Sequence, residues 1–149
     1  MTPNTDSQAT STELTGGARF SYEDMVVAYN LTALLLEGHA AGLSGMVQSV
    51  AVQQAADQPM DDIIVEINDV EGRRVLALQV KRSLRICAAA SNTDFLEVMS
   101  ASVATRKSPQ FQPGRNAYGV ITEHVAVAPF RALSRLIEWV RAGRFCQAL

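Results

Sequence analysis

The stretch DDIIVEINDVEGRRVLALQVKRS (residues 61–83) decides the fold, because it contains two β-type runs on either side of a turn. Apolar and β-branched residues dominate DDIIVEI (61–67) and RVLALQVK (74–81), while Asn, Asp and Gly gather between them. A two-residue turn at Glu71 and Gly72 is expected, since glycine readily adopts the positive φ that such turns require. The stretch therefore predicts an antiparallel β-hairpin.

The expected register gives this hairpin one apolar and one polar face. With Val70 opposite Arg73, the apolar residues of the two strands face one another: Ile63, Val65, Ile67, Leu76, Leu78 and Val80. On the other face Asp62 falls opposite Lys81, and Gln79 points the same way as Lys81 because alternate side chains share a face. A slip of one residue would divide the apolar set between both faces, so the burial pattern supports this register.

The polar face brings a carboxylate, an amide and an ammonium group to the ends of neighbouring strands. Magnesium prefers oxygen ligands, which Asp62, the Gln79 amide and the Val80 backbone carbonyl would supply. Lys81 would orient or activate an attacking water and offset the charge that builds on a phosphate. This pattern predicts metal-assisted phosphodiester hydrolysis. A solvated strand face and an Asp pair that caps a turn are the alternative interpretations.

The segments around the hairpin predict the element order α-β-β-β-α-β-α. The first helix has Ser21 as its N-cap and Asp24 as the partner in a capping box, and Gly38 ends it. The other expected elements are a strand over 46–54, a helix over 94–107, a strand over 117–127 and, after Pro129, an amphipathic helix over 130–142. Leu136 and Trp139 of the last helix are expected in the core, and the apolar side of this helix could also support a dimer. This order predicts an α/β fold with a small mixed β-sheet flanked by helices.

The composition is that of one folded domain. The chain has 149 residues, of which 48% are hydrophobic and 19% charged, enough for one core but not for two. Thr, Ser, Asn and Gln are frequent in the first fifteen residues (1–15), which predicts a disordered leader before a single domain over 16–149. The net charge of -2 provides no general attraction for nucleic acid, so such binding would need a local basic patch.

Two further features bear on the environment of the protein. Cys87 and Cys146 lie far apart and in no metal-ligand spacing, which favours a reducing, cytoplasmic location. No stretch has the length and apolarity of a transmembrane helix, so no membrane partner is expected. His39 and His124 have no spaced partner, which argues against a catalytic role for either.

The DD pair followed by QVK (79–81) resembles the PD-(D/E)xK nucleases, in their QxK form. The chain from Gly16 to Gly143 is similar to the N-terminal nuclease domains of bacterial anti-phage effectors. In those domains a glycine and an aromatic-x-aromatic-Gln/Glu step lead into the first helix, and Phe20, Tyr22 and Glu23 match that step. The resemblance implies a restriction-endonuclease-like fold.

The resemblance also implies roles for individual residues. Asp62 would be the principal metal ligand, with Asp61 as the competing candidate. Gln79 would be the second ligand and Lys81 the catalytic lysine, while Glu23 would stand beside the metal. The expected cofactor is Mg2+, with Mn2+ as a substitute.

Some positions depart from the family pattern. Met60 stands where the motif has proline, and Gln53 and Gln54 stand where relatives often carry a glutamate, which leaves few carboxylates to hold a metal. The candidate phosphate contacts directly follow the catalytic strand: Arg82, Ser83 and Arg85.

The resemblance implies an endonuclease that cuts DNA, double-stranded in the first instance, as the effector domain of an anti-phage defence system. Cutting both strands favours a homodimer or higher oligomer, and a sensor domain or subunit would lie outside this chain. Two alternatives share the same fold. One is a nuclease for RNA or single strands, and the other is a catalytically degenerate module that binds nucleic acid or supports assembly.

Overall fold

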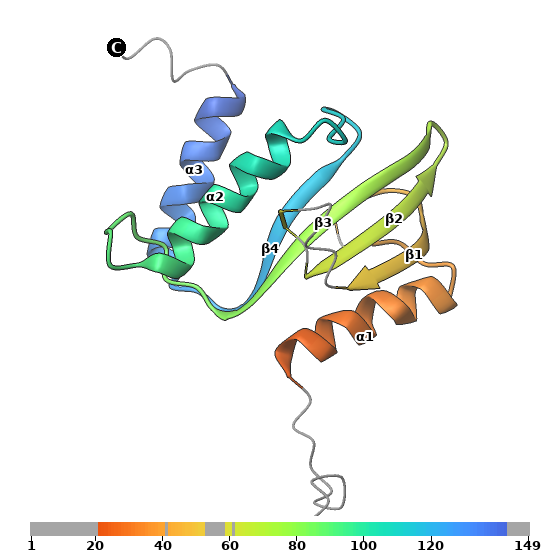
Figure 1. Ribbon diagram of the computed structural model, residues 1–149, viewed down its shortest axis with the longest axis horizontal. Helices are drawn as coiled ribbons and strands as arrows, with labels where there is room; N and C mark the ends of the chain where they lie inside the picture. The colour runs from red at the N-terminus through yellow and green to blue at the C-terminus, as the bar shows by residue number, and fades with distance from the viewer. Residues whose placement is uncertain (1–20, 41, 53–58, 61, 143–149) are drawn as a thin grey trace, which may run out of the picture.

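The computed structural model describes residues 21–40, 42–52, 59–60 and 62–142, with the exception of the Arg141 side chain. Its elements, in chain order, are α1 (Tyr22–Leu35), β1 (Met46–Val52), β2 (Ile63–Asp69), β3 (Gly72–Ser83), α2 (Thr93–Lys107), β4 (Ala117–His124) and α3 (Val127–Arg141). Figure 1 shows these helices and strands as one α/β arrangement around a single sheet. The expected element order is therefore confirmed.

Several expectations concern residues outside the described part of the chain: the leader over 1–15, Phe20, Gln53, Gln54, Asp61 and Cys146. Within the described part, no helix is long and apolar enough to cross a lipid bilayer.

The sheet is mixed, with the strand order β1-β2-β3-β4. β1 pairs with β2 and β2 pairs with β3 in antiparallel fashion, whereas β4 pairs with β3 in parallel. A parallel pair needs a crossover connection, and α2 lies in it. The last residues of β3 and β4 therefore lie beside the first residues of β2, at one end of the strands (Figure 1). We call this end the open end of the hairpin, and the opposite end, around Val70 and Glu71, the turn end.

Helices cover both faces of the sheet. On the first face, α1 packs on the main core, whose buried residues are Val26, Ala40, Val47, Ile63, Val65, Ile67, Leu76 and Leu78. On the second face, Met60 packs with Ile64 and Ala77, and Ala101 of α2 lies against them. The apolar face expected for the hairpin is thus confirmed, and alternation along β3 places Gln79 and Lys81 on the face of α2.

The hairpin register differs from the expected one by two residues. Asp69 pairs with Gly72, and Ile63 pairs with Leu78, so the turn lies at Val70 and Glu71. The expected turn at Glu71 and Gly72 is therefore wrong. The Asp69 side chain explains the shift, because its Oδ1 accepts the Glu71 N–H at 2.8 Å and bends the chain one residue earlier. Gly72 still adopts a positive φ of 106°, but directly after the turn.

An even shift leaves every side chain on its expected face, because strand side chains alternate with a period of two. The shift does change partners across the hairpin. Continued by one residue, the observed register places Asp62 beside Gln79, so the expected pairing of Asp62 with Lys81 is also wrong.

The first helix begins as expected. Ser21 caps α1 by accepting the Asp24 N–H at 3.1 Å, while the Asp24 carboxylate accepts the Ser21 N–H at 2.8 Å. The backbone hydrogen bond from Ser21, with help from its hydroxyl, lowers the pKa of Asp24 below its usual value. The capping box expected from these two residues is confirmed.

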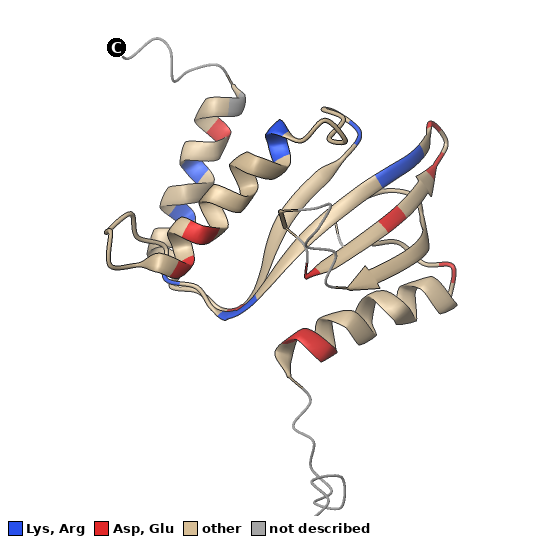
Figure 2. Cartoon of the chain, in the orientation of Figure 1, with Lys and Arg blue, Asp and Glu red and all other residues tan. Residues whose placement is uncertain are grey.

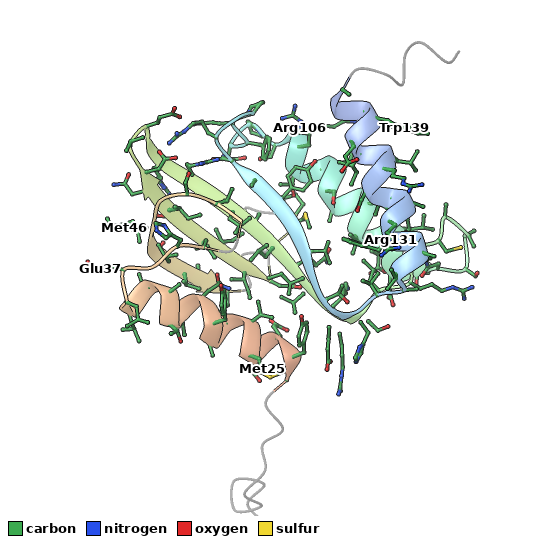
Figure 3. The ribbon with its side chains drawn as sticks, turned by 180° about the vertical axis from the view of Figure 1, so that it is seen from behind. Met25, Glu37, Met46, Arg106, Arg131 and Trp139 are labelled. Atoms are coloured by element: carbon green, nitrogen blue, oxygen red, sulfur yellow. The ribbon has the colours of Figure 1, made fainter. Side chains whose placement is uncertain are left out.

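The last helix differs from its expectation in two ways. It begins at Val127, before Pro129, because proline is tolerated in the first turn, where its missing N–H has no helical acceptor. Its apolar side is also largely uncovered: Leu133 packs against the cluster of Leu84, Phe95 and Val98, but Trp139 remains 53% exposed (Figure 3). The expected burial of Leu136 and Trp139 is therefore wrong for the described residues.

Candidate functional site

The open end of the hairpin holds Asp62 in a fixed position. Its Oδ2 accepts the backbone N–H of Val80 at 2.6 Å. Asp62 lies one residue before β2. Its carboxylate bonds to β3 beyond Ile63 and Leu78, the last residue pair of the two strands. This bond holds the carboxylate next to the segment that contains Gln79 and Lys81, although the cross-strand pairing differs from the expected one.

Gln79 carries an amide oxygen without a partner. Gln79 follows Leu78 on β3 and shares the face of Ala77, on the side of α2. Its Oε1 is buried and accepts no hydrogen bond from any described residue. Leaving a buried acceptor unpaired costs about 1–3 kcal/mol. An amide oxygen is also a hard ligand of the kind that magnesium prefers, so the donor set at this position fits such an ion.

Lys81 lies on the same face two residues further along and pairs with Thr122 of β4 in the parallel ladder. Its side chain is half-buried, and no carboxylate of the described residues lies within 4.0 Å of its ammonium group. An ammonium group without an acidic partner remains available for a phosphate or a water molecule.

Glu23 lies in the first turn of α1 and is half-buried. Tyr22, its neighbour, and Val80, the neighbour of Lys81, both pack against the main core. Figure 2 shows the acidic first turn of α1 and the basic end of β3 on the same side of the molecule. The Glu23 side chain makes no ion pair with the described basic residues. Its helix packs on the sheet face opposite to the one that carries Gln79 and Lys81, so no described contact joins Glu23 to these residues or to Asp62.

The candidate phosphate contacts lie at the surface beyond β3. Arg82 is exposed and its Nε lies 3.4 Å from Oε2 of Glu123. Ser83 pairs with His124 at the end of the parallel ladder. The Arg85 side chain is exposed and has no described acidic partner, whereas its backbone oxygen accepts a hydrogen bond from Asn92 at 2.6 Å.

The described part of the site contains few metal-binding side chains. Among the residues that the structure describes, no group of three or more His, Cys, Asp or Glu side chains could hold a metal ion. Asp61 lies outside these residues. The described donors at the open end are therefore one carboxylate, one amide oxygen and backbone carbonyls.

An ionic cluster at the turn end has no counterpart among the residues expected from the sequence. Asp69 accepts hydrogen bonds from Arg74 at 3.1 Å and from Arg115 at 3.2 Å, and only 9% of its side chain is exposed. Arg115 also contacts Glu71 at 2.7 Å. Burial raises the pKa of Asp69, but its hydrogen bonds and the charge of Arg115 outweigh burial, so the net pKa is lowered. We call Asp69, Arg74, Arg115 and Glu71 the turn-end cluster.

No local sequence pattern predicts the turn-end cluster. Arg115 follows the loop SPQFQPG (108–114), and an arginine in such a loop is ordinarily a solvated cation. It instead reaches Asp69 from 46 residues away. Only the parallel placement of β4 next to β3 brings the two residues together.

Comparisons with known proteins add no relative to this picture. No family model matches the chain, no curated protein matches its sequence and no solved structure matches its fold.

Proposed function

We propose that this chain is a metal-dependent endonuclease that hydrolyses phosphodiester bonds in DNA at the open end of the hairpin. The observation that carries the proposal is the 2.6 Å hydrogen bond from Val80 to the Asp62 carboxylate. It fixes a carboxylate beside an amide oxygen without a partner and a lysine without an acidic partner. A carboxylate and an amide oxygen suit a divalent ion, and a lysine can offset charge on a phosphate, so these groups fit metal-assisted phosphodiester hydrolysis.

Each residue has a distinct role in this proposal. Asp62 and the Gln79 amide would hold Mg2+ or Mn2+, with the Val80 carbonyl, Glu23 and Asp61 as further candidate ligands. A bound divalent ion supplies Lewis-acid polarisation of the phosphate. Lys81 orients the attacking water and offsets the negative charge that builds on the phosphate oxygens.

The surface beyond β3 would position the nucleic acid. Arg82, Ser83 and Arg85 follow the catalytic strand and would contact phosphates, which fix the position of a duplex without reading its sequence. The role in anti-phage defence, the oligomer and the separate sensor depend on the resemblance to defence effectors. The cytoplasmic location depends on the spacing of Cys87 and Cys146. These features belong to the proposal on those grounds alone.

One observation favours a second candidate function, a nuclease fold that binds nucleic acid or supports assembly without cutting it. Asp62 is the sole described carboxylate hydrogen-bonded to β3 at the open end, and one of its oxygens already accepts the Val80 N–H. Gln79 adds no charge. Such a site would hold a divalent ion weakly, which would leave little or no hydrolysis.

The test is cleavage of supercoiled plasmid DNA with Mg2+ or Mn2+, comparing the natural chain with Lys81→Ala. We expect metal-dependent nicking or linearisation that is at least about a hundredfold slower in Lys81→Ala, in line with the loss of a catalytic proton-transfer or charge-stabilising group. Lys107→Ala is the matched control, because Lys107 is an exposed lysine at the distant end of α2. Equal cutting by Lys81→Ala and the natural chain would refute the assignment of the site.

The same preparation separates the two candidate functions. An intact metal site raises the melting temperature as Mg2+ or Mn2+ is added, since a ligand that binds only the folded state stabilises it. A degenerate module would show no such shift and no cutting, but would still bind labelled DNA. Labelled RNA and single-stranded DNA, tested as substrates in parallel, identify the class of nucleic acid that is cut.

A further inference from the structure

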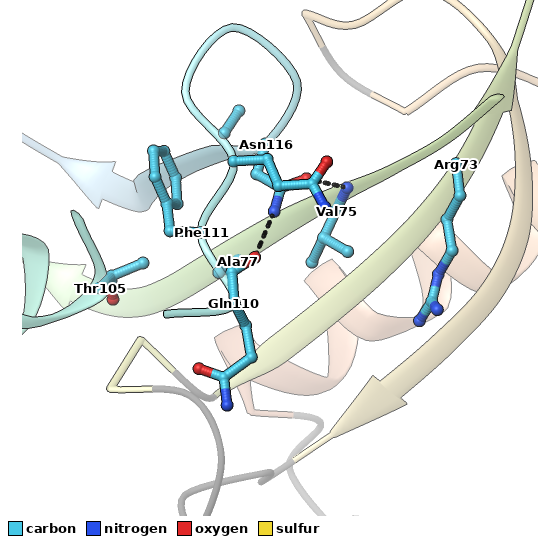
Figure 4. Close-up of a pocket in the computed structure, with 9 residues that line it drawn as sticks. Arg73, Val75, Ala77, Thr105, Gln110, Phe111 and Asn116 are labelled. Carbon is cyan, nitrogen blue, oxygen red and sulfur yellow. Dashed lines mark hydrogen bonds between the residues drawn. The ribbon is translucent and has the colours of Figure 1, made fainter. Parts of the chain in front are cut away.

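A separate cavity lies at the other end of the same sheet face. It measures about 290 Å3 and lies between the start of β3, the end of α2 and the segment that leads into β4. Figure 4 shows Thr105 and Phe111 on one side of this cavity and Arg73 and Val75 on the other. Its volume is close to the lower limit of ligand pockets, which suits a single ring system better than a peptide or an oligosaccharide.

The walls of the cavity are held in place by their own contacts. Asn116 accepts the Val75 N–H at 3.2 Å and donates to the Gln110 backbone oxygen at 3.1 Å. Phe111 is held between the Arg106 guanidinium, 5.2 Å from its ring centre, and the ring of Tyr118 at 5.5 Å. These contacts form the cavity before any ligand arrives.

One polar group that lines the cavity lacks a partner. Thr105 is 2% exposed, and its Oγ1 makes no hydrogen bond with any described residue. A helical Thr or Ser commonly bonds the carbonyl one turn earlier, as Thr32 and Ser102 do here, each at 2.8 Å. Thr105 does not, so its buried hydroxyl remains available to a ligand.

The remaining lining residues define the chemistry of that ligand. Val75, Ala77, Ala117 and Phe111 provide apolar walls, whereas Thr105 and Gln110 provide hydrogen-bonding groups. A planar heteroaromatic ring has apolar faces and a polar edge, and therefore matches both. Arg73 also lines the cavity, and its ion pair with Glu66 is largely exposed and therefore weak, so its guanidinium can contact a phosphate.

We propose that this cavity binds a nucleobase, carried on a nucleoside monophosphate. The inference does not depend on the nuclease activity proposed above, because the cavity shares no residue with the open end of the hairpin. Thr105 recognises the edge of the base, the apolar walls exclude water from its faces, and Arg73 contacts the phosphate.

The test is titration of the whole chain with adenosine, guanosine, cytidine and uridine 5′-monophosphates, followed by NMR chemical shifts of the backbone amides. We expect saturable shifts in residues 105–117 with at least one nucleotide, and none with ribose 5-phosphate. Thr105→Val keeps the side-chain volume and should weaken binding about tenfold, roughly the loss of one hydrogen bond. The matched control is Thr32→Val, a helical threonine on α1 that should bind as the natural chain does.

Three results would overturn the proposal: no saturable shift with any nucleotide, equal shifts with ribose 5-phosphate, or unchanged binding in Thr105→Val. If Thr105→Val does not fold, Gln110→Ala tests the same cavity at an exposed position, and unchanged binding there would also count against it. Lys81→Ala separates the two proposals, because nucleotide binding at the cavity should persist in this variant even where DNA cutting is lost.

Discussion

The two ends of the β2–β3 hairpin carry similar residues but use them differently. At the turn end, Asp69 is surrounded by Arg74 and Arg115, and only 9% of its side chain is exposed. At the open end, Asp62 accepts a backbone N–H, while Lys81 has no acidic partner among the described residues. Ions that are paired within the protein hold its strands together. An unpaired cation beside a fixed carboxylate is instead available to an external phosphate.

The comparison is tested most severely by removing one carboxylate at each end. Asp62→Asn keeps an oxygen that can accept the Val80 N–H but removes the negative charge, so we expect the melting temperature to change little. Metal-dependent DNA cutting should fall by at least about a hundredfold, because the proposed principal ligand is lost. Plasmid cleavage and thermal melting of the same preparations measure the two effects.

Asp69→Asn is the matched variant at the turn end. It should lower the melting temperature, because Arg74 and Arg115 lose the negative charge and one of the two acceptor oxygens that they share, while cleavage by the remaining folded protein stays near that of the natural chain. The opposite pattern, with lost cleavage in Asp69→Asn and a destabilised Asp62→Asn, would reverse the roles assigned to the two ends.

The next largest expected effect is a loss of stability when Arg115, which contacts the turn end from the loop before β4, is replaced. Arg115 donates to Asp69, to Glu71 and to the Arg73 backbone oxygen. Arg115→Ala removes these bonds together and should lower the melting temperature by several degrees, since it leaves a carboxylate of low exposure with fewer donors. Arg85→Ala, which removes an exposed arginine without an acidic partner, is the control and should melt close to the natural chain.

How much of this arrangement the sequence predicts depends on the range of the interactions. Alternation of apolar residues placed Val65 and Leu76 on one face correctly, because a period of two survives an even shift in register. The position of the turn was not predictable from that period, since the Asp69 side chain moves the bend by bonding the Glu71 N–H. The pattern of burial therefore predicts the face of each strand residue, whereas a local hydrogen bond sets the position of the turn.

The candidate site shows the same division. Parity alone predicts Asp62, Gln79 and Lys81 on one face. Gln79 and Lys81 share a face of β3, whereas Asp62 lies just before β2 and is held by the Val80 N–H. Two observations were beyond the sequence: the bond from Val80 to Asp62, and the burial of the Gln79 amide oxygen. Both depend on how the end of β2 meets β3 in space, which alternation of residue types does not encode.

A smaller effect is expected in DNA binding. Arg85→Ala should weaken binding several-fold and reduce the magnitude of the slope of log affinity against log salt concentration by about one, because one phosphate contact is lost. Lys107→Ala is the control, since Lys107 is an exposed cation at the end of α2, away from the open end. Fluorescence anisotropy of a labelled duplex at several salt concentrations measures both slopes. Equal losses in the two variants would mean that DNA does not bind preferentially at the open end.

The smallest expected effect is the pH dependence that the turn-end cluster adds to stability. The pKa of Asp69 lies below the ordinary value of 3.8 in the folded protein. A carboxyl group with a lowered folded pKa stabilises the fold at pH values above its unfolded pKa, and this contribution is lost as the pH falls through the folded value. The difference in melting temperature between the natural chain and Asp69→Asn should therefore be largest near neutral pH and shrink below about pH 4.

Arg115→Ala should reduce this pH dependence, because Arg115 is one of the groups that lower the pKa of Asp69. A difference that stays constant from pH 7 to pH 3 would show that Asp69 acts by packing and not by its charge.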